Sequence, residues 1–294
     1  MKKINIPRII LHIILIALSL TYILPLVLMI SISVSSESDI GMYGYRFIPA
    51  NIDFEAYKLA FANPQQMIQS YKITFLFSIV STLGGMLIQS LMAYPLARSC
   101  YKLKKFTLRY LLVTMLFNGG LVPTYILITK YLHLGNSFWV YVIPSLFTAW
   151  NVILYKTFFQ NLPSGLIEAA KIDGASEYAI FFKMVLPLST PILATLGFTA
   201  LVAKWNDWNT SLLYIRDAKL YSLQYMLQRI LREAEYLKSL ESDGASSALM
   251  DASERPVETL KYAMAVIAAG PMLVIFPLFQ KYFAKGMVVG SVKG

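Results

Sequence analysis

Few residues in this 294-residue chain have side chains that could catalyse a reaction or bind a metal. The one cysteine, Cys100, and two isolated histidines, His12 and His133, are too few and too far apart for a metal site. The sequence contains no Gly-x-x-x-x-Gly-Lys-Ser/Thr loop for nucleotide phosphates, and no nucleophile with a matching base and acid. We therefore expect no catalytic, ATPase, metal or cofactor site in the chain itself.

The residues best suited to binding another molecule are charged and lie between two long apolar runs. They belong to EAAKIDGASEYAIFFKMVLPL, residues 168–188. Ala169 and Ala170 are small enough for another backbone to approach closely. Charges for a partner's polar groups come from Glu168, Lys171 and Asp173. Two interpretations stay open for residues 161–187, the charged segment: a surface for a soluble partner, or a solvated loop.

Two short helices must position these residues. Pro163 and Ser164 predict a helix start, with Ser164 as N-cap and the helix running to residue 172. Gly174 suits the left-handed residue that ends a helix, and Ser176 can cap a second helix to about residue 185. Pro187 then limits or kinks the entry into the next apolar run. The charged segment is expected to be helix, glycine turn and helix.

The composition places this segment in a polytopic membrane protein. Hydrophobic residues make up 57% of the chain and charged residues only 14%, with a mean hydropathy of +0.57. Six apolar stretches approach the roughly 20 residues that cross a bilayer as a helix. We expect an all-α fold in one transmembrane domain, residues 1–294, with spans at about 9–32, 73–97, 110–129, 138–155, 185–203 and 262–279. The first follows a basic start but is long enough to be a retained anchor.

The distribution of charge predicts the orientation of these spans. On the side of both termini lie 14 basic and three acidic residues, and on the opposite side 12 basic and 13 acidic residues. By the positive-inside rule, both termini and the charged segment are expected to be cytoplasmic. The net charge of +10 is thus a topology signal, and no nucleic-acid partner is expected.

Two longer segments are predicted on the external side. Residues 33–72 are expected to be irregular with one short helix, and residues 209–260 form the longer external loop. Within it, leucine, isoleucine and alanine recur at helical spacing over 220–240, which predicts an amphipathic helix. This helix could lie on lipid headgroups, pack on its own loops or dock a partner.

Polar residues within the spans are candidates for a solute path, because polar groups are costly in lipid. They are Gln89, Asn118, Trp150 and Asn151. Packing or an interhelical hydrogen bond is the alternative for each of them. Gly119, Gly120 and Pro123 should weaken the third span.

The motif WNDWN, residues 205–209, ends the fifth span. Trp205 and Trp208 fit the aromatic belt at a membrane surface, although they could also stack on a sugar ring. Asn206 and Asp207 could line the mouth of the path and accept hydrogen bonds from sugar hydroxyls.

The charged segment resembles the EAA loop of ATP-binding-cassette importer permeases, which reads EAA, three residues, G, nine residues, I-x-LP. The matching residues are Glu168, Ala169, Ala170, Gly174, Leu186 and Pro187, with Met184 in place of the isoleucine. The resemblance implies that these residues form the coupling helix that docks on an ATPase subunit.

The resemblance covers nearly the whole chain. AYPLAR at 93–98, NGGLVPTYILI at 118–128, WNDWN and the ending KGMVVGSVKG are similar to carbohydrate-importing permeases, especially the second permease subunit of maltose-type systems. It implies that the tail, Gly290, Ser291, Val292, Lys293 and Gly294, contacts the ATPase subunits.

The same resemblance implies a multi-pass protein of the bacterial inner membrane with the type I importer architecture. Its expected partners are a second homologous permease subunit, two ATP-binding subunits that hold ATP and Mg, an extracytoplasmic solute-binding protein and membrane lipid. The chain would import an oligosaccharide by alternating access. Alternatives are a permease of the same superfamily for a non-sugar solute, an ion-coupled secondary transporter, and a membrane enzyme. The six spans lack charged residues apart from His12 near the first span's start, which argues against ion coupling.

Overall fold

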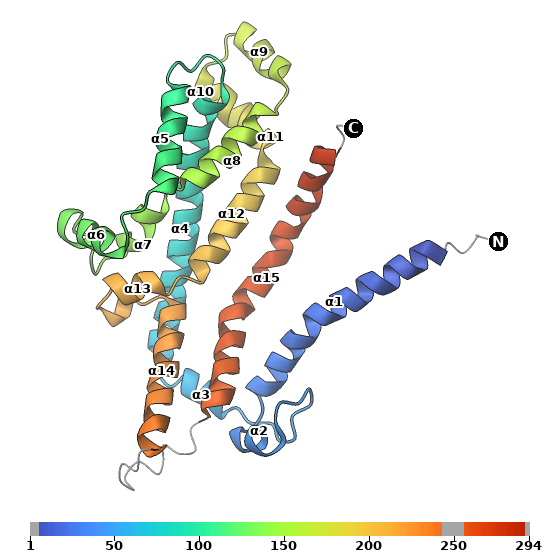
Figure 1. Ribbon diagram of the computed structural model, residues 1–294, viewed down its shortest axis with the longest axis vertical. Coiled ribbons are helices and arrows are strands. Elements are labelled where there is room, and N and C mark those ends of the chain that lie inside the picture. The colour runs from blue at the N-terminus through green and yellow to red at the C-terminus, as the bar shows by residue number, and fades with distance from the viewer. Residues whose placement is uncertain (1–5, 243–255, 292–294) are drawn as a thin grey trace. The chain divides into compact units, whose positions relative to one another are not determined.

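The computed structural model describes residues 6–242 and 256–291, and in these two ranges it is helical with no strand. Figure 1 labels the main helices. The α-helices are α1 (Ile6–Ser33), α2 (Glu37–Tyr43), α3 (Glu55–Ala60), α4 (Pro64–Ala97), α5 (Lys104–Leu116), α6 (Leu121–Ile126), α7 (Trp139–Val142), α8 (Ala149–Gln160), α9 (Ser164–Ile172), α10 (Glu177–Ile180), α11 (Leu186–Leu188), α12 (Thr190–Trp205), α13 (Asn209–Tyr214), α14 (Leu223–Ser242) and α15 (Val257–Ser291). Two π-helical turns, η1 (Leu127–Tyr131) and η3 (Phe181–Val185), and two 3₁₀ turns, η2 (Ile143–Ser145) and η4 (Ala218–Leu220), complete the elements.

The chain divides into two compact units, which we describe separately. The first comprises Met1–Met67 with Met226–Pro271, and the second comprises Ile68–Tyr225 with Met272–Gly294. Helices α4, α14 and α15 each continue from one unit into the other.

In the first unit, α1 is the most apolar helix. Its Ile10–Ser33 stretch contains an 18-residue window with a mean hydropathy of 2.7, none of which is buried inside the chain. Side chains such as Ile13 and Ile16 are therefore exposed, as expected for a helix that contacts lipid. In the same unit, the Glu37 carboxylate accepts the backbone N–H groups of Glu258 and Thr259, both at 3.0 Å, and so caps the start of α15.

In the second unit, three predicted spans are bent helix pairs. Apart from these pairs, three single helices could each cross a membrane by length and composition: α1, α4 and the Val257–Pro277 part of α15. The bend is 110° between α5 and the α6–η1 helix, 48° between the α7–η2 helix and α8, and 77° between Glu177–Leu188 and α12. The total is three spanning helices, or up to six if each bent pair is one span, within the described residues.

The causes of the bends lie in the sequence. Gly120 has φ +85°, a conformation that side chains disfavour, and it directly precedes α6. The helix ending at α11 carries Pro187 in its last turn, and Ser189 separates it from α12. The predicted weakening of the third span at Gly119–Gly120 and the kink after Pro187 are thus confirmed.

Two buried clusters hold the second unit together. One includes Phe77, Tyr141 and Ile128, and the other includes Tyr155, Phe181 and Leu196. Helices α4 and α12 also approach closely, because a Cβ added to Gly197 would lie 2.7 Å from Met86 Sδ.

Several element boundaries differ from the predictions. Helix α4 begins at Pro64 rather than near residue 73, and residues 33–72 hold two further short helices, α2 and α3. The predicted amphipathic helix is confirmed as α14, although residues 243–255 of the external loop lie outside the described residues.

Candidate functional site

The charged segment forms an ordered helix–turn–helix whose turn is built by the residues of its motif. Gly174 has φ +78° and follows α9; its N–H donates to Lys171 O at 3.1 Å, and the N–H of Ala175 donates to Ala170 O at 2.9 Å. These two bonds are the Schellman motif, which ends a helix with a left-handed residue. Ser176 then caps α10, since its Oγ accepts the N–H of Ala179 at 3.2 Å. The predicted roles of Gly174 and Ser176 are confirmed.

One local prediction was wrong. Helix α9 begins at Ser164 and its N-cap residue is Pro163, so Ser164 lies inside the helix rather than before it. The difference is one residue, and the helix still ends at Ile172 as expected.

The motif residues of the charged segment divide into a packed group and an exposed group. Ala170 and Leu186 pack against the buried cluster around Phe181. Glu168 and Ala169 are exposed, and the neighbouring Ile172 is 87% exposed. One edge of α9 thus presents a carboxylate, a small side chain and an apolar side chain to a partner. In Figure 1, α9 lies beyond the ends of α4, α5 and α8.

A chain of polar contacts ties the charged segment to the end of α4. Tyr94 Oη donates to Glu177 Oε2 at 2.6 Å, and Arg98 Nη2 donates to Tyr94 Oη at 2.6 Å. Lys171 Nζ lies 2.6 Å from Glu177 Oε1. Glu177 therefore joins α9, α10 and α4, and we call these four residues the Glu177 clamp. No pattern in the sequence indicates this clamp, because Tyr94 and Glu177 are 83 positions apart.

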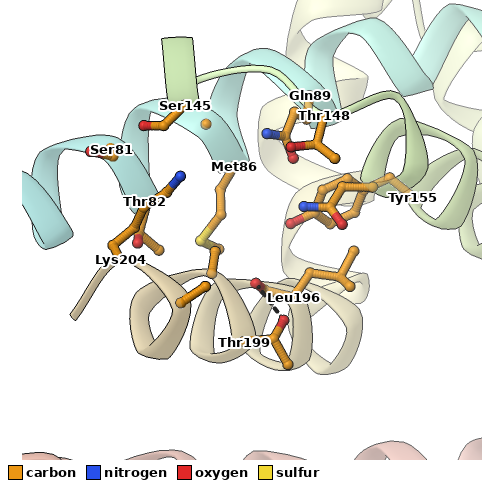
Figure 2. A pocket seen from close by; sticks show the side chains of 14 residues that line it. Ser81, Thr82, Met86, Gln89, Ser145, Thr148, Tyr155, Leu196, Thr199 and Lys204 are labelled. Carbon is orange, nitrogen blue, oxygen red and sulfur yellow. Dashed lines mark hydrogen bonds between the residues drawn. The ribbon is translucent and has the colours of Figure 1, made fainter. Parts of the chain in front are cut away.

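A polar cavity of about 230 Å³ lies between α4, α8 and α12 in the second unit (Figure 2). Two amides, Gln89 and Asn151, and the ammonium group of Lys204 line it. Hydroxyl groups come from Ser81, Thr82, Ser145, Thr148, Tyr155 and Thr199. Such a set of hydrogen-bonding groups can bind a polyhydroxylated molecule.

The structure brings two of the predicted path residues together and separates the others. Gln89 is 4% exposed, and its Nε2 donates to Leu146 O at 2.9 Å, so it also satisfies a carbonyl at the break before α8. Asn151 lines the same cavity, whereas Trp150 is exposed and does not. Asn118 lies in the break before α6, where its Oδ1 accepts the N–H of Gly120 at 2.9 Å.

The WNDWN motif is more structural than predicted. Trp205 is 2% exposed and lies 6.3 Å from the ring of Tyr71, so it packs inside the chain and the aromatic-belt interpretation is wrong for it. Asp207 accepts the N–H and Oγ1 of Thr210 at 3.0 and 2.6 Å, which orders the start of α13. Asn206 is exposed, and its Oδ1 accepts Gln224 Nε2 at 3.1 Å.

The tail can be described only in part. Gly290 and Ser291 are the last two residues of α15, and Val292, Lys293 and Gly294 lie outside the described residues. In the ranges that the structure describes, no three His, Cys, Asp or Glu side chains form a group that could hold a metal ion.

Comparison with known proteins adds independent information. Residues 4–289 match the family model of the inner membrane component of binding-protein-dependent transport systems. The chain is 37% identical over 272 residues to Protein LplC of Bacillus subtilis (strain 168), covering 92% of this chain and 90% of that protein. It is 35% identical over 280 residues to the polygalacturonan/rhamnogalacturonan transport system permease protein YtcP of the same organism, covering 95% and 96% of the two chains. A solved bacterial ABC transporter involved in the import of the acidic polysaccharide alginate has the same fold, with a TM-score of 0.74, 24% identity and coverage of 96% and 98%.

Proposed function

Because the chain belongs to the family of inner membrane components of binding-protein-dependent transport systems, we propose that it is a permease subunit of an ATP-driven oligosaccharide importer. The similar proteins include YtcP, whose name states a polysaccharide-derived solute, and a melibiose/raffinose/stachyose import permease protein at 30% identity. The proposal places the chain in a bacterial inner membrane with both termini in the cytoplasm.

The observation that carries the proposal is the exposed edge of α9. Glu168, Ala169 and Ile172 project from a helix whose end is fixed by the Schellman motif and whose base is held by the Glu177 clamp. A short helix held in this way transmits force, because it moves together with α4 when it is pushed. We propose that this edge docks on one of two ATP-binding subunits, which hold ATP and Mg, and that the tail from Gly290 also contacts them.

Alternating access is the mechanism that we propose for this arrangement. If ATP binding favours one of two packed states of the assembly, the docked segment passes that preference to the spans. A second permease subunit completes the path, and an extracytoplasmic binding protein delivers the solute. Gln89 and Asn151 face the solute in the polar cavity, while Asn118, Trp150, Asn206 and Asp207 stay candidates along the rest of the path.

The test is uptake and ATPase activity of the assembled importer with two changes in the charged segment, Gly174→Leu and Glu168→Lys. A Cβ at Gly174 meets no atom of this chain within 4 Å, so the local cost is the left-handed backbone alone, about 1–2 kcal/mol. We expect the chain to insert and assemble but to lose uptake and substrate-stimulated ATPase activity.

Matched controls lie in the first unit. Gly44→Leu adds the same bulk at a glycine that also has a left-handed φ, +70°, and no atom within 4 Å, and Glu55→Lys makes the same charge reversal at an exposed carboxylate of α3. Both should keep activity. If uptake and stimulated ATPase activity survive both changes in the charged segment, the coupling role is wrong.

A further inference from the structure

Lys204 is the residue of the polar cavity that the importer function leaves unexplained. It extends from the last turn of α12, and Figure 2 shows its side chain directed towards α4, between Thr82 and Met86. Within the described residues its Nζ makes no hydrogen bond and no ion pair. A lysine near the end of a membrane-spanning helix can extend to the membrane surface, but Lys204 lines a cavity inside the helix bundle, and an ionisable group there is by default a candidate functional site.

The nearest acid in the sequence, Asp207, is not in ion-pair contact with Lys204. Asp207 lies close enough to Lys204 for an electrostatic interaction, yet both of its carboxylate oxygens accept hydrogen bonds from Thr210. The cavity lining contains no other charged side chain and no carboxylate. Asp207 therefore supplies a nearby negative charge, but among the described residues of the cavity the ammonium group of Lys204 has no anion in contact with it.

Two buried hydroxyl groups in the same cavity also lack partners. Thr82 Oγ1 and Tyr155 Oη are inaccessible to solvent, and neither makes a hydrogen bond within the described residues. Tyr155 is fully buried, and Thr82 is 6% exposed. Buried polar atoms are normally satisfied, so each such atom requires an explanation. Because both oxygens are closed off from a water-sized probe, they could reach a ligand in the cavity only after their side chains rotate.

The number and kind of these groups define the ligand. One ammonium group with hydroxyl and amide groups around it matches a sugar ring that carries one carboxylate. A neutral sugar would accept hydrogen bonds from the ammonium group through its hydroxyl oxygens but would supply no negative charge to balance it. The cavity, at about 230 Å³, is smaller than the 300–1,000 Å³ of a typical small-molecule site, so it accepts one sugar unit of a chain.

We propose that the polar cavity binds an acidic sugar unit of the transported oligosaccharide, with Lys204 holding its carboxylate and the hydroxyl and amide groups of the lining bonding its hydroxyls. This inference rests on the proposed function as an oligosaccharide importer. If it is correct, this chain contributes through Lys204 to the importer's preference for acidic over neutral sugars.

The test measures uptake by the assembled importer in proteoliposomes. Two probes are acidic, trigalacturonate and trimannuronate, and the comparison probes are their methyl esters and neutral raffinose. The wild type should import at least one acid. Lys204→Met keeps the aliphatic stem but removes the charge, and we expect it to lower uptake of that acid by about 10- to 100-fold, as for a lost hydrogen bond between charged groups. Lys204→Arg should keep uptake. Lys219→Met, at an exposed lysine of the same unit, should have no effect.

The outcomes separate this inference from the proposed function. If the acid is imported equally well by the wild type and Lys204→Met, or if the wild type imports only neutral or esterified probes, the inference is overturned and the importer function stands. If the wild type imports no sugar of either kind, the proposed function itself fails, and this inference fails with it. Basal ATPase activity of Lys204→Met reports whether the variant assembles.

Discussion

The Glu177 clamp predicts that one carboxylate holds α9 and α10 to the end of α4. We expect Glu177→Gln to loosen this attachment while leaving the helices formed, because the amide keeps the shape but loses the charge. The perturbation removes the ion pair with Lys171 and weakens the hydrogen bond from Tyr94.

The size of the effect follows from burial. Glu177 is 51% exposed and Lys171 is 43% exposed, so their ion pair contributes only about 0.2–1 kcal/mol. Tyr94 is 9% exposed, and a buried hydrogen bond to a charged acceptor contributes about 1.5–3 kcal/mol, less here because its acceptor is half exposed. We expect a loss of about 1–2 kcal/mol in the free energy of local opening, which is a factor of roughly 5–30.

Hydrogen exchange measures this loss directly. In Glu177→Gln, amides of α9 and its turn should exchange about 5–30 times faster, whereas amides of α12 should keep their rates. Tyr94→Phe should accelerate the same amides, and the double variant should be less than additive because the two changes remove one shared bond. Tyr101→Phe, whose hydroxyl lies 3.3 Å from Thr107 Oγ1, is the control and should change little. Unchanged α9 exchange in both Glu177→Gln and Tyr94→Phe would refute the reasoning.

Three further predictions concern other parts of the chain. Gly197→Ala should lower the free energy of unfolding of the purified chain by about 1–3 kcal/mol, because the added methyl group contacts Met86. Adding Met86→Ala to this variant should restore part of the loss. If the wild type and Gly197→Ala have equal melting temperatures, the close helix contact is contradicted. Glu37→Gln should raise hydrogen exchange at the first turn of α15, since a helix cap contributes about 0.5–2 kcal/mol, and unaltered exchange there would show that the cap is dispensable. Deletion of residues 290–294 should alter the ATPase activity of the assembled importer without changing the binding protein's affinity for sugar. Normal ATPase activity in this variant would contradict the proposed contact between the tail and the ATP-binding subunits.

Local features of the fold were predictable because their causes are local. Gly174 and Ser176 act on neighbours within a few residues, so the sequence alone placed the turn and the cap correctly. The breaks after Leu116 and Leu188 were foreshadowed by glycine and proline nearby.

Features that depend on distant residues were not predictable in this way. Trp205 was assigned to a membrane surface because tryptophan is common there, but its environment depends on Tyr71, more than a hundred residues earlier. The place of Lys204 in the cavity lining was not predicted, because hydropathy alone does not tell which side of α12 faces α4. Gln89 and Asn151 were correctly chosen as polar residues in spans, yet only the fold places them in one cavity.

The bent helices have a consequence for how the chain is made. Helices α5, α8 and α12 contain 13, 12 and 16 residues, which at about 1.5 Å each fall short of a bilayer core of roughly 30 Å. Backbone groups at their breaks must be shielded by protein, as the carbonyl of Leu146 is by Gln89 of α4. Since α4 precedes all three in the chain, the long straight helix leaves the ribosome first. It is therefore available as a template in the bilayer before each broken segment emerges, so biogenesis depends on the order of synthesis.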